Sequence, residues 1–189
     1  MGYYTRQELE NMGFKSLGKH VMVSTLSRIY NPEMTELGDF VRIDDFCVLM
    51  GKITLKNYVH IAMYCHLGGT REGITMDEHS ECAYRCAVIT HSSDYSLQTL
   101  HVPCVPDKYK KGRSGPVYIG KYCLIGYDSL VMPNVTIAEG CSFGAFSYIA
   151  KSTEPWGLYD GKPAQRIGDN SKECLDTVEA VERELQGIE

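Results

Sequence analysis

The residues best suited to chemistry stand at the start of the longest irregular stretch of the chain. An apolar run at residues 86–89 predicts a buried strand, His91 follows it, and Asp94 comes three residues later. A neutral imidazole can accept a proton near pH 7, and a nearby carboxylate can fix its tautomer or stabilise the imidazolium. We therefore predict an acid/base role for His91, which stands at the mouth of a candidate active-site loop, residues 92–116. Either Asp94 or Glu81 could orient it, and the sequence alone does not choose between them.

A cluster of mostly positive charge lies within the same loop. Its charged members are Asp107, Lys108, Lys110, Lys111 and Arg113. Ammonium and guanidinium groups bind phosphates, so the cluster could contact a phosphorylated ligand, and a solvated polar loop is the alternative. The whole chain has a formal net charge of −5, which argues against a general nucleic-acid binder.

Eight cysteines occur in a chain that begins with no export signal, which predicts reduced thiols rather than a disulfide framework. Two pairs, Cys47 with Cys65 and Cys123 with Cys141, are separated by 18 residues. This spacing predicts that they occupy equivalent core positions in a repeat. A catalytic thiol would need a neighbouring base, and the sequence places none.

The elements that must position these residues are predicted by a six-residue repeat. Bulky apolar residues occupy every sixth position at Leu37, Ile43, Leu49, Leu55, Ile61 and Leu67, and again at Ile119, Ile125, Val131, Ile137, Phe143 and Ile149. This period fits neither an α-helix nor an ordinary strand, and it predicts an all-β fold, a parallel β-helix of hexapeptide repeats. Three hexads form a coil of 18 residues, so Leu37 should stack on Leu55, and Ile119 on Ile137.

The repeat also predicts how a single domain, residues 1–189, is organised. Residues 1–16 should form a helical cap in which Thr5 and Glu8 make a capping box. The solenoid should span 17–152, with an irregular register at 74–89 and the inserted loop 92–116. Residues 153–189 should form a turn and a helix, which together with the first helix would cover the open ends of the solenoid. No segment resembles a signal peptide or membrane span, so a cytoplasmic protein is expected.

Three further segments carry a resemblance to a known family. The loop opens with His91 to Tyr95 and continues through Val105 to Tyr109, and the solenoid is followed by Gly161, Lys162, Pro163 and Ala164. With the hexads, these segments resemble the hexapeptide-repeat acyltransferases, most closely those that acetylate sugars in bacterial surface-polysaccharide biosynthesis. Lys162 replaces the asparagine that is frequent in the family. The resemblance implies a left-handed β-helix, a homotrimer with active sites between neighbouring solenoids, and acetyl-CoA as co-substrate.

The same resemblance implies roles for individual residues. His91 would remove a proton from a sugar hydroxyl or amine that attacks the thioester directly, and a backbone N–H of Gly126 or Tyr127 would stabilise the oxyanion. The residues implied to contact CoA are Gly144, Ala145, Ala150, Lys151, Lys162 and Arg166. Those implied to contact the acceptor are Asp44, Asp45, Tyr95 and Lys108.

Four functions remain to be compared. O-acetylation of a sugar hydroxyl is the main expectation, and N-acetylation of an amino sugar on a nucleotide is the close alternative. A γ-class carbonic anhydrase would need three histidines around zinc, and the His-x4-His spacing of that class is absent from the sequence. A non-catalytic trimeric scaffold would tolerate loss of His91 and would not bind CoA.

Overall fold

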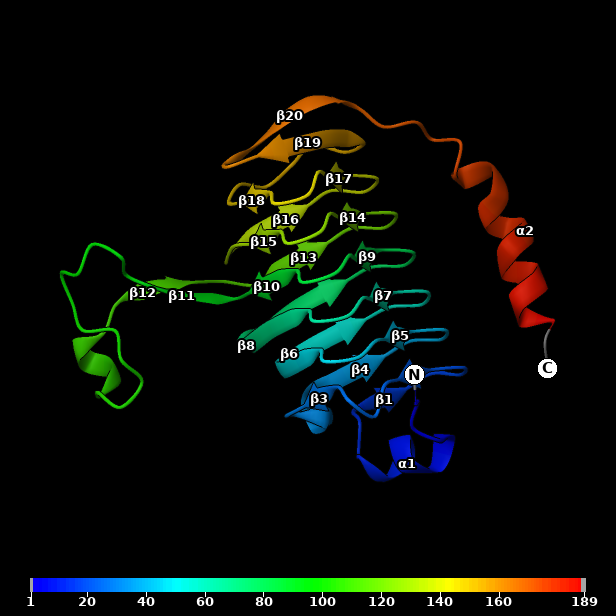
Figure 1. Ribbon diagram of the computed structural model, residues 1–189, viewed down its shortest axis with the longest axis horizontal. Helices are drawn as coiled ribbons and strands as arrows, with labels where there is room; N and C mark the ends of the chain where they lie inside the picture. Colours follow the sequence, from blue (N-terminus) through cyan, green and yellow to red (C-terminus); the bar gives the residue numbers. More distant parts are fainter. Residues whose placement is uncertain (1, 188–189) are drawn as a thin grey trace.

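In the computed structural model, which describes residues 2–187, the chain winds into a column of stacked parallel strands (Figure 1). One face consists of β2 (Met22–Val23), β5 (Arg42–Ile43), β7 (His60–Ile61), β9 (Glu81–Cys82), β14 (Leu124–Ile125), β17 (Ser142–Phe143) and β19 (Gly157–Gly161), with β20 (Ala164–Asp169) antiparallel beyond it. The remaining faces are formed by β1 (Ser16–Leu17), β3 (Arg28–Ile29), β4 (Thr35–Leu37), β6 (Val48–Leu55), β8 (His66–Met76), β10 (Ala87–Ile89), β13 (Val117–Ile119), β15 (Leu130–Val131), β16 (Val135–Ile137) and β18 (Tyr148–Ile149). The structure confirms the predicted parallel β-helix.

The predicted stacking register is confirmed. Leu37 pairs with Leu55, and Ile119 with Ile137. All twelve hexad residues are at most 3% exposed, so one elongated apolar core runs through the column. The eight cysteines are free thiols, and six of them lie in this core. The Sγ of Cys47, for example, is 3.0 Å from the carbonyl oxygen of Ala62 in the next coil.

The segment that breaks the hexad register, residues 74–89, keeps the coil in a shifted frame. Leu55 pairs with Met76, 21 residues later, because the chain between the two halves of β8 contains three extra residues. Cys82 and Val88 then follow Met76 at six-residue intervals and are fully buried. The expected shift to an irregular register is therefore an offset of three residues, after which the six-residue repeat continues.

Corner residues with left-handed backbone conformation let the chain turn between faces. Many of them are aromatic, including Phe40, Tyr58 and Tyr122, with φ angles of 57°, 60° and 57°. Such a conformation costs a non-glycine residue about 1 kcal/mol. At one corner the rings stack in an aromatic ladder, with centroids 4.5 to 6.4 Å apart, which offsets that cost. The ladder consists of His20, Phe40, Tyr58, His79, Tyr122 and Trp156.

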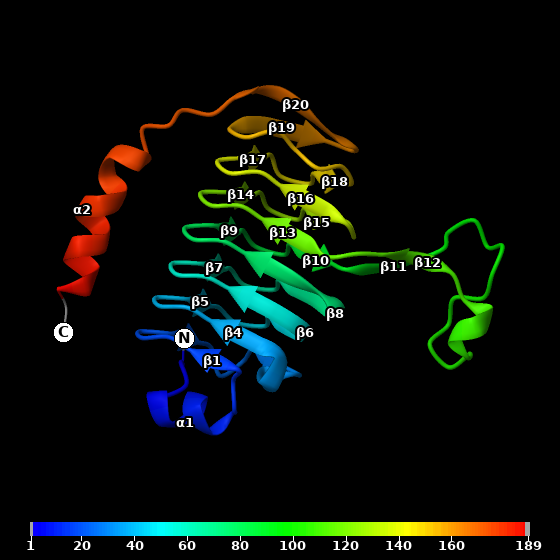
Figure 2. The same cartoon turned by 180° about the vertical axis from the view of Figure 1, so that it is seen from behind.

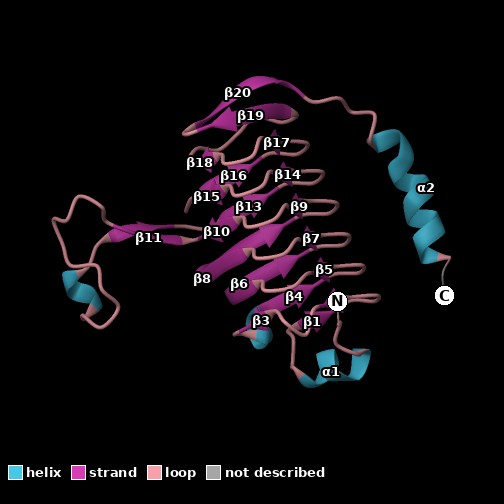
Figure 3. Cartoon of the chain, viewed as in Figure 1, coloured by secondary structure: helices cyan, strands magenta, loops and turns pink. Residues whose placement is uncertain are grey.

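One end of the column is covered as predicted, and the other end is covered differently. Helix α1 (Arg6–Asn11) covers the first coil and buries Leu9, and the predicted capping box is present, since the Thr5 N–H donates to Glu8 Oε2 at 2.7 Å. At the other end, the turn expected in the first part of residues 153–189 is the β19–β20 hairpin, which stacks on β17. Helix α2 (Leu175–Gln186) lies beside the solenoid instead of over its end (Figures 1 and 3).

Candidate active site

The inserted segment projects from the solenoid on a two-stranded antiparallel ribbon (Figures 1 and 2). Strands β11 (His91–Ser93) and β12 (Gly112–Ser114) form the ribbon, and a short 3-10 helix, η2 (Asp107–Tyr109), lies near its tip. A second 3-10 helix, η1 (Pro32–Met34), belongs to an early coil. His91 therefore stands on a strand, which restricts the direction of its side chain more than a free loop would.

The imidazole of His91 is held by two features of the opposite strand. His91 and Ser114 are directly paired across the ribbon, and Nδ1 lies 2.9 Å from Ser114 Oγ. Gly112 leaves room for the ring, because a Cβ at that position would lie 2.9 Å from His91 Cε1 and 2.5 Å from the Ser92 carbonyl oxygen. Only a residue without a side chain fits beneath the ring in this arrangement.

His91 lines a hollow of about 420 Å³, the loop pocket. Its other charged or titratable lining residues are His101, Asp107, Lys110 and Lys111. Asp107 Oδ1 forms an ion pair with Lys110 Nζ at 2.7 Å, and this contact holds the pKa of Asp107 below its usual range. The pocket thus combines two imidazoles with two ammonium groups, and the charge of one ammonium group, Lys110, is neutralised by Asp107.

Neither carboxylate that the sequence suggested as a partner of His91 contacts it. Asp94 instead accepts the backbone N–H of Ser96 at 2.9 Å, and hydrogen bonds from the Ser96 hydroxyl and from this N–H lower the pKa of Asp94. Glu81 lies on β9 and contacts His60. Among the residues that the structure describes, the hydrogen-bond partner of the His91 ring is Ser114. The sequence did not indicate Ser114, because its pairing with His91 depends on how the excursion folds back.

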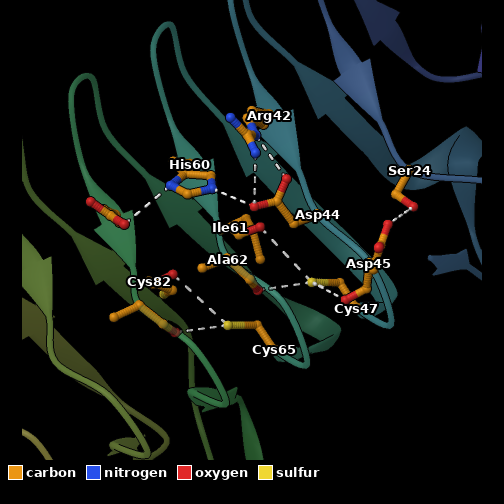
Figure 4. Close-up of polar contacts among 12 residues, drawn as sticks. Ser24, Arg42, Asp44, Asp45, Cys47, His60, Ile61, Ala62, Cys65 and Cys82 are labelled. Atoms are coloured by element: carbon orange, nitrogen blue, oxygen red, sulfur yellow. Dashed lines mark hydrogen bonds and ion pairs between the residues drawn. The ribbon is translucent and has the colours of Figure 1, made fainter. Parts of the chain in front are cut away.

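Glu81 belongs to a second group of charged side chains, the His60 cluster of Arg42, Asp44, His60 and Glu81 (Figure 4). His60 Nδ1 is 3.1 Å from Glu81 Oε1, and Nε2 is 2.9 Å from Asp44 Oδ2. The hydrogen bond to Glu81, with that to Asp44, raises the pKa of His60. Burial would raise the pKa of Asp44, but hydrogen bonds from Arg42 and His60 outweigh it and lower the value.

The acceptor contacts implied for four residues find little support in their surroundings. The Asp44 side chain is only 5% exposed, and Asp45 accepts a hydrogen bond from the Ser24 hydroxyl. Tyr95 is 81% exposed and its hydroxyl accepts from Ser92 Oγ. Lys108 lies over the ring of its neighbour Tyr109 and does not line the loop pocket. The two aspartates are occupied by partners within the chain.

Three residues implied to contact CoA come together beside the last coil. Ala150, Lys151 and Arg166 line a hollow of about 290 Å³, the C-terminal pocket, between β18 and the β19–β20 hairpin. Arg166 is paired with Asp169 at 2.6 Å, which raises its pKa. Arg113 Nη2 is 3.4 Å from the Ala150 carbonyl oxygen, so the ribbon that carries His91 also contacts the edge of this pocket.

The other implied CoA residues lie apart from that pocket. Gly126, Tyr127, Gly144 and Ala145 are at a corner of the solenoid, and Lys162 Nζ is 5.2 Å from the centre of the nearby Phe146 ring. A Cβ at Gly126 would lie 2.3 Å from the Phe143 carbonyl oxygen, and one at Gly144 would lie 2.5 Å from Asp160 Oδ1. Close packing against the backbone of the next coil therefore requires glycine at position 126, whereas at position 144 the exposed Asp160 side chain would have to move.

Within residues 2–187 no group of three His, Cys, Asp or Glu side chains is arranged to hold a metal ion. None of the helices in the same part of the chain is long and apolar enough to span a membrane.

A parallel β-helix with a histidine-bearing ribbon defines the class, and comparisons with known proteins define the family. The family described as bacterial transferase hexapeptide (six repeats) matches residues 116–151. A dTDP-4-amino-4,6-dideoxy-D-glucose acyltransferase from Escherichia coli is 35% identical over 179 residues, which cover 93% of each chain. The chain therefore belongs to the hexapeptide-repeat acyltransferases, as its motifs indicated.

Two further relatives extend the comparison. The solved structure of AntD, an N-acyltransferase from Bacillus cereus, in complex with dTDP and 3-hydroxybutyryl-CoA, matches with a TM-score of 0.94 and 36% identity. The match covers 97% of this chain and 98% of AntD. A putative colanic acid biosynthesis acetyltransferase, WcaF from Escherichia coli K12, is 26% identical over 148 residues, covering 78% of this chain and 65% of WcaF. The two relatives that match nearly the whole chain are thus an acyltransferase of an amino-sugar nucleotide and an N-acyltransferase.

Proposed function

We propose that this acyltransferase moves an acyl group from an acyl-CoA to the amino group of a deoxyamino sugar carried on a nucleotide. The observation that carries the proposal is the 35% identity, over 93% of both chains, to an acyltransferase of dTDP-4-amino-4,6-dideoxy-D-glucose. The AntD complex with dTDP and 3-hydroxybutyryl-CoA supports the same two classes of ligand. This reaction replaces O-acetylation as the favoured function.

In the proposed reaction the sugar nitrogen attacks the thioester carbonyl carbon directly. A nitrogen–carbon bond forms, Nε2 of His91 takes a proton from that nitrogen, and the carbon–sulfur bond breaks with CoA leaving as its thiolate. A backbone N–H of Gly126 or Tyr127 would stabilise the oxyanion in between. Asp94 and Glu81 have no part in this scheme because their partners lie elsewhere.

The two pockets suggest where the ligands bind. The loop pocket places Lys110 and Lys111 near His91, and ammonium groups there suit the diphosphate of a sugar nucleotide. The C-terminal pocket holds Lys151 and Arg166 and suits part of CoA. Arg113 lies between two lining residues of the loop pocket, Gly112 and Ser114, and contacts Ala150 of the C-terminal pocket.

The proposal includes a homotrimer whose active sites lie between neighbouring copies. Large apolar side chains are exposed at one corner on successive coils, including Phe46, Tyr64, Tyr84, Tyr127 and Phe146. On a monomer these would form an unusual apolar ridge, whereas a neighbouring copy would bury them. Light scattering after gel filtration should give three times the chain mass of 21.2 kDa.

The test of the reaction measures donor binding and turnover separately. Acetyl-CoA and 3-hydroxybutyryl-CoA are titrated calorimetrically into the purified protein, and each is then incubated with dTDP-4-amino-4,6-dideoxyglucose. We expect saturable binding near one donor per chain and a sugar nucleotide whose mass increases by one acyl group. Donor binding without transfer to any amino-sugar nucleotide would contradict the acceptor, and the absence of binding by any acyl-CoA would favour the scaffold.

A further inference from the structure

We infer that Ser114 is the positioning residue for His91: its hydroxyl accepts the Nδ1–H of the imidazole and leaves Nε2 to take the proton of the acceptor. The role in catalysis rests on the proposed function. The hydrogen bond and the tautomer it selects do not, and they can be measured on the protein without substrate.

The geometry of the ribbon carries the assignment. His91 and Ser114 are a directly opposed pair on β11 and β12, and side chains at such positions lie on the same face of the ribbon. The distance of 2.9 Å between Nδ1 and Oγ is that of a good hydrogen bond. Gly112 lies on that face beneath the ring and leaves no space for a different side chain. The ring is therefore held at Nδ1, and the hydroxyl fixes its orientation.

The charged groups around His91 do not replace this contact. In the loop pocket the one carboxylate among the lining residues is Asp107, and it is ion-paired with Lys110. The remaining titratable lining residues, His101 and Lys111, carry no negative charge. The partner that directs His91 is thus a neutral hydroxyl, which orients the ring without the negative charge that a carboxylate would contribute to an imidazolium.

A neutral positioning residue suits an amine acceptor better than an alcohol. As an amine nitrogen bonds to the thioester carbon it becomes positively charged, and its proton then transfers readily to an uncharged imidazole. An alcohol stays a weak acid until late in the attack and depends more on a base strengthened by a carboxylate. Ser114 therefore agrees with an amino group as the acceptor class.

The first experiment determines the tautomer of the His91 imidazole in the intact protein. Nitrogen-15 histidine spectra are recorded at about pH 8.5, where an ordinary imidazole is neutral, and a His91→Gln variant assigns the signal. We expect the Nδ1–H tautomer in the wild type and in Ser114→Thr, and a shift toward Nε2–H in Ser114→Ala. An Nε2–H tautomer in the wild type would overturn the inference, whether or not the protein acylates an amino sugar.

The second experiment measures how Ser114 variants change kcat, KM and the pH profile with an amino-sugar nucleotide as the acceptor. Ser114→Ala should lower kcat about tenfold because the base loses its orientation, with little change in KM, and Ser114→Thr should restore it. Ser114→Asp should move the acid limb of the kcat/KM profile to higher pH, because a carboxylate favours the imidazolium. Wild-type kcat and pH profile in both Ala and Asp variants would contradict the inference. An inactive wild type with the expected tautomer would contradict the proposed function alone.

Discussion

Two histidines in this protein have opposite surroundings. Both ring nitrogens of His60 are hydrogen-bonded to carboxylates, and these contacts raise its pKa. His91 has a neutral hydroxyl at Nδ1 and stands in an open pocket on a projecting ribbon. His60 links strands β5, β7 and β9, three successive coils, whereas the hydrogen-bond partner of His91 within residues 2–187 lies on its own ribbon.

We interpret this difference as one between a structural histidine, His60, and the proposed general base, His91. The carboxylates at both ring nitrogens favour the imidazolium of His60 and leave neither nitrogen open to a substrate, so His60 stabilises the stack of coils. A ring held at one nitrogen keeps the other for proton transfer. The predictions that follow test this contrast.

Removing the imidazole of the loop pocket should have the largest effect. His91→Ala should lower turnover by at least about a hundredfold, the usual contribution of a general base. Calorimetry should show nearly unchanged affinity for acetyl-CoA, because the base does not hold the donor. Turnover close to that of the wild type would exclude His91 as the base.

Displacing the ring without removing it should have the next largest effect. Gly112→Ala adds a Cβ that would lie 2.9 Å from His91 Cε1, so kcat/KM should fall about tenfold or more through misplacement of the base. Gly168→Ala is the matched control, since its Cβ meets only the end of Leu158 at 3.9 Å. Equal activity in the two variants would show that the fit beneath the ring is unimportant.

The His60 cluster should affect stability and spare catalysis. His60→Gln removes the bridge between Asp44 and Glu81 and should lower the free energy of unfolding by roughly 1 kcal/mol, a small value because the cluster is partly exposed to solvent. His66→Gln, a half-buried histidine on the next strand, is the control. Urea unfolding at one fixed protein concentration measures both variants. Loss of turnover in folded His60→Gln protein would contradict a purely structural role for His60.

The stability that His60 contributes should depend on pH in a defined direction. Because the folded pKa of His60 is raised, its contribution is complete below about pH 6.5 and is lost as the pH rises through the folded value. Lowered pKa values of Asp44 and Glu81 make their contributions complete above about pH 4.5 and lost on further acidification. The difference in unfolding free energy between wild type and His60→Gln should therefore be larger at pH 6 than at pH 9. A difference that grows with pH would have the wrong sign.

The smallest effect concerns a third histidine, His79, which ties α2 to the aromatic ladder. Its Nε2 is 2.7 Å from Glu182 Oε1. Glu182→Gln should weaken this partly exposed pair by about 0.5 kcal/mol and roughly double the amide exchange rate of α2, with turnover unchanged. Unchanged exchange would show that the pair does not hold the helix.

The sequence predicts features whose residues follow a short pattern, and it misses contacts that depend on the shift of register within β8. The hexads and the Thr5 capping box could be found because their patterns lie within a few residues of one another. Arg42 and His60 are 18 residues apart, so their adjacency was accessible to the same reasoning. Glu81 lies 21 residues beyond His60, and only knowledge of the three extra residues in β8 would have placed it there.

Ser114 could not be predicted from the sequence as the partner of His91, for a different reason. Ser114 is 23 residues away, across a segment with no period, and their pairing is set by the antiparallel return of the chain. Proximity in sequence suggested Asp94 instead. The choice between amine and hydroxyl acceptors was also inaccessible, because the same base can serve both.

The amino group as acceptor and His91 as the base are tested most directly by a competition between two acceptors. The wild-type protein, one acyl-CoA and equal amounts of dTDP-4-amino-4,6-dideoxyglucose and its counterpart with a hydroxyl in place of the amine are mixed, and the products are identified by mass spectrometry. We expect acylation of the amino sugar alone, and loss of that product in His91→Ala. Preferential acylation of the hydroxyl sugar would contradict it.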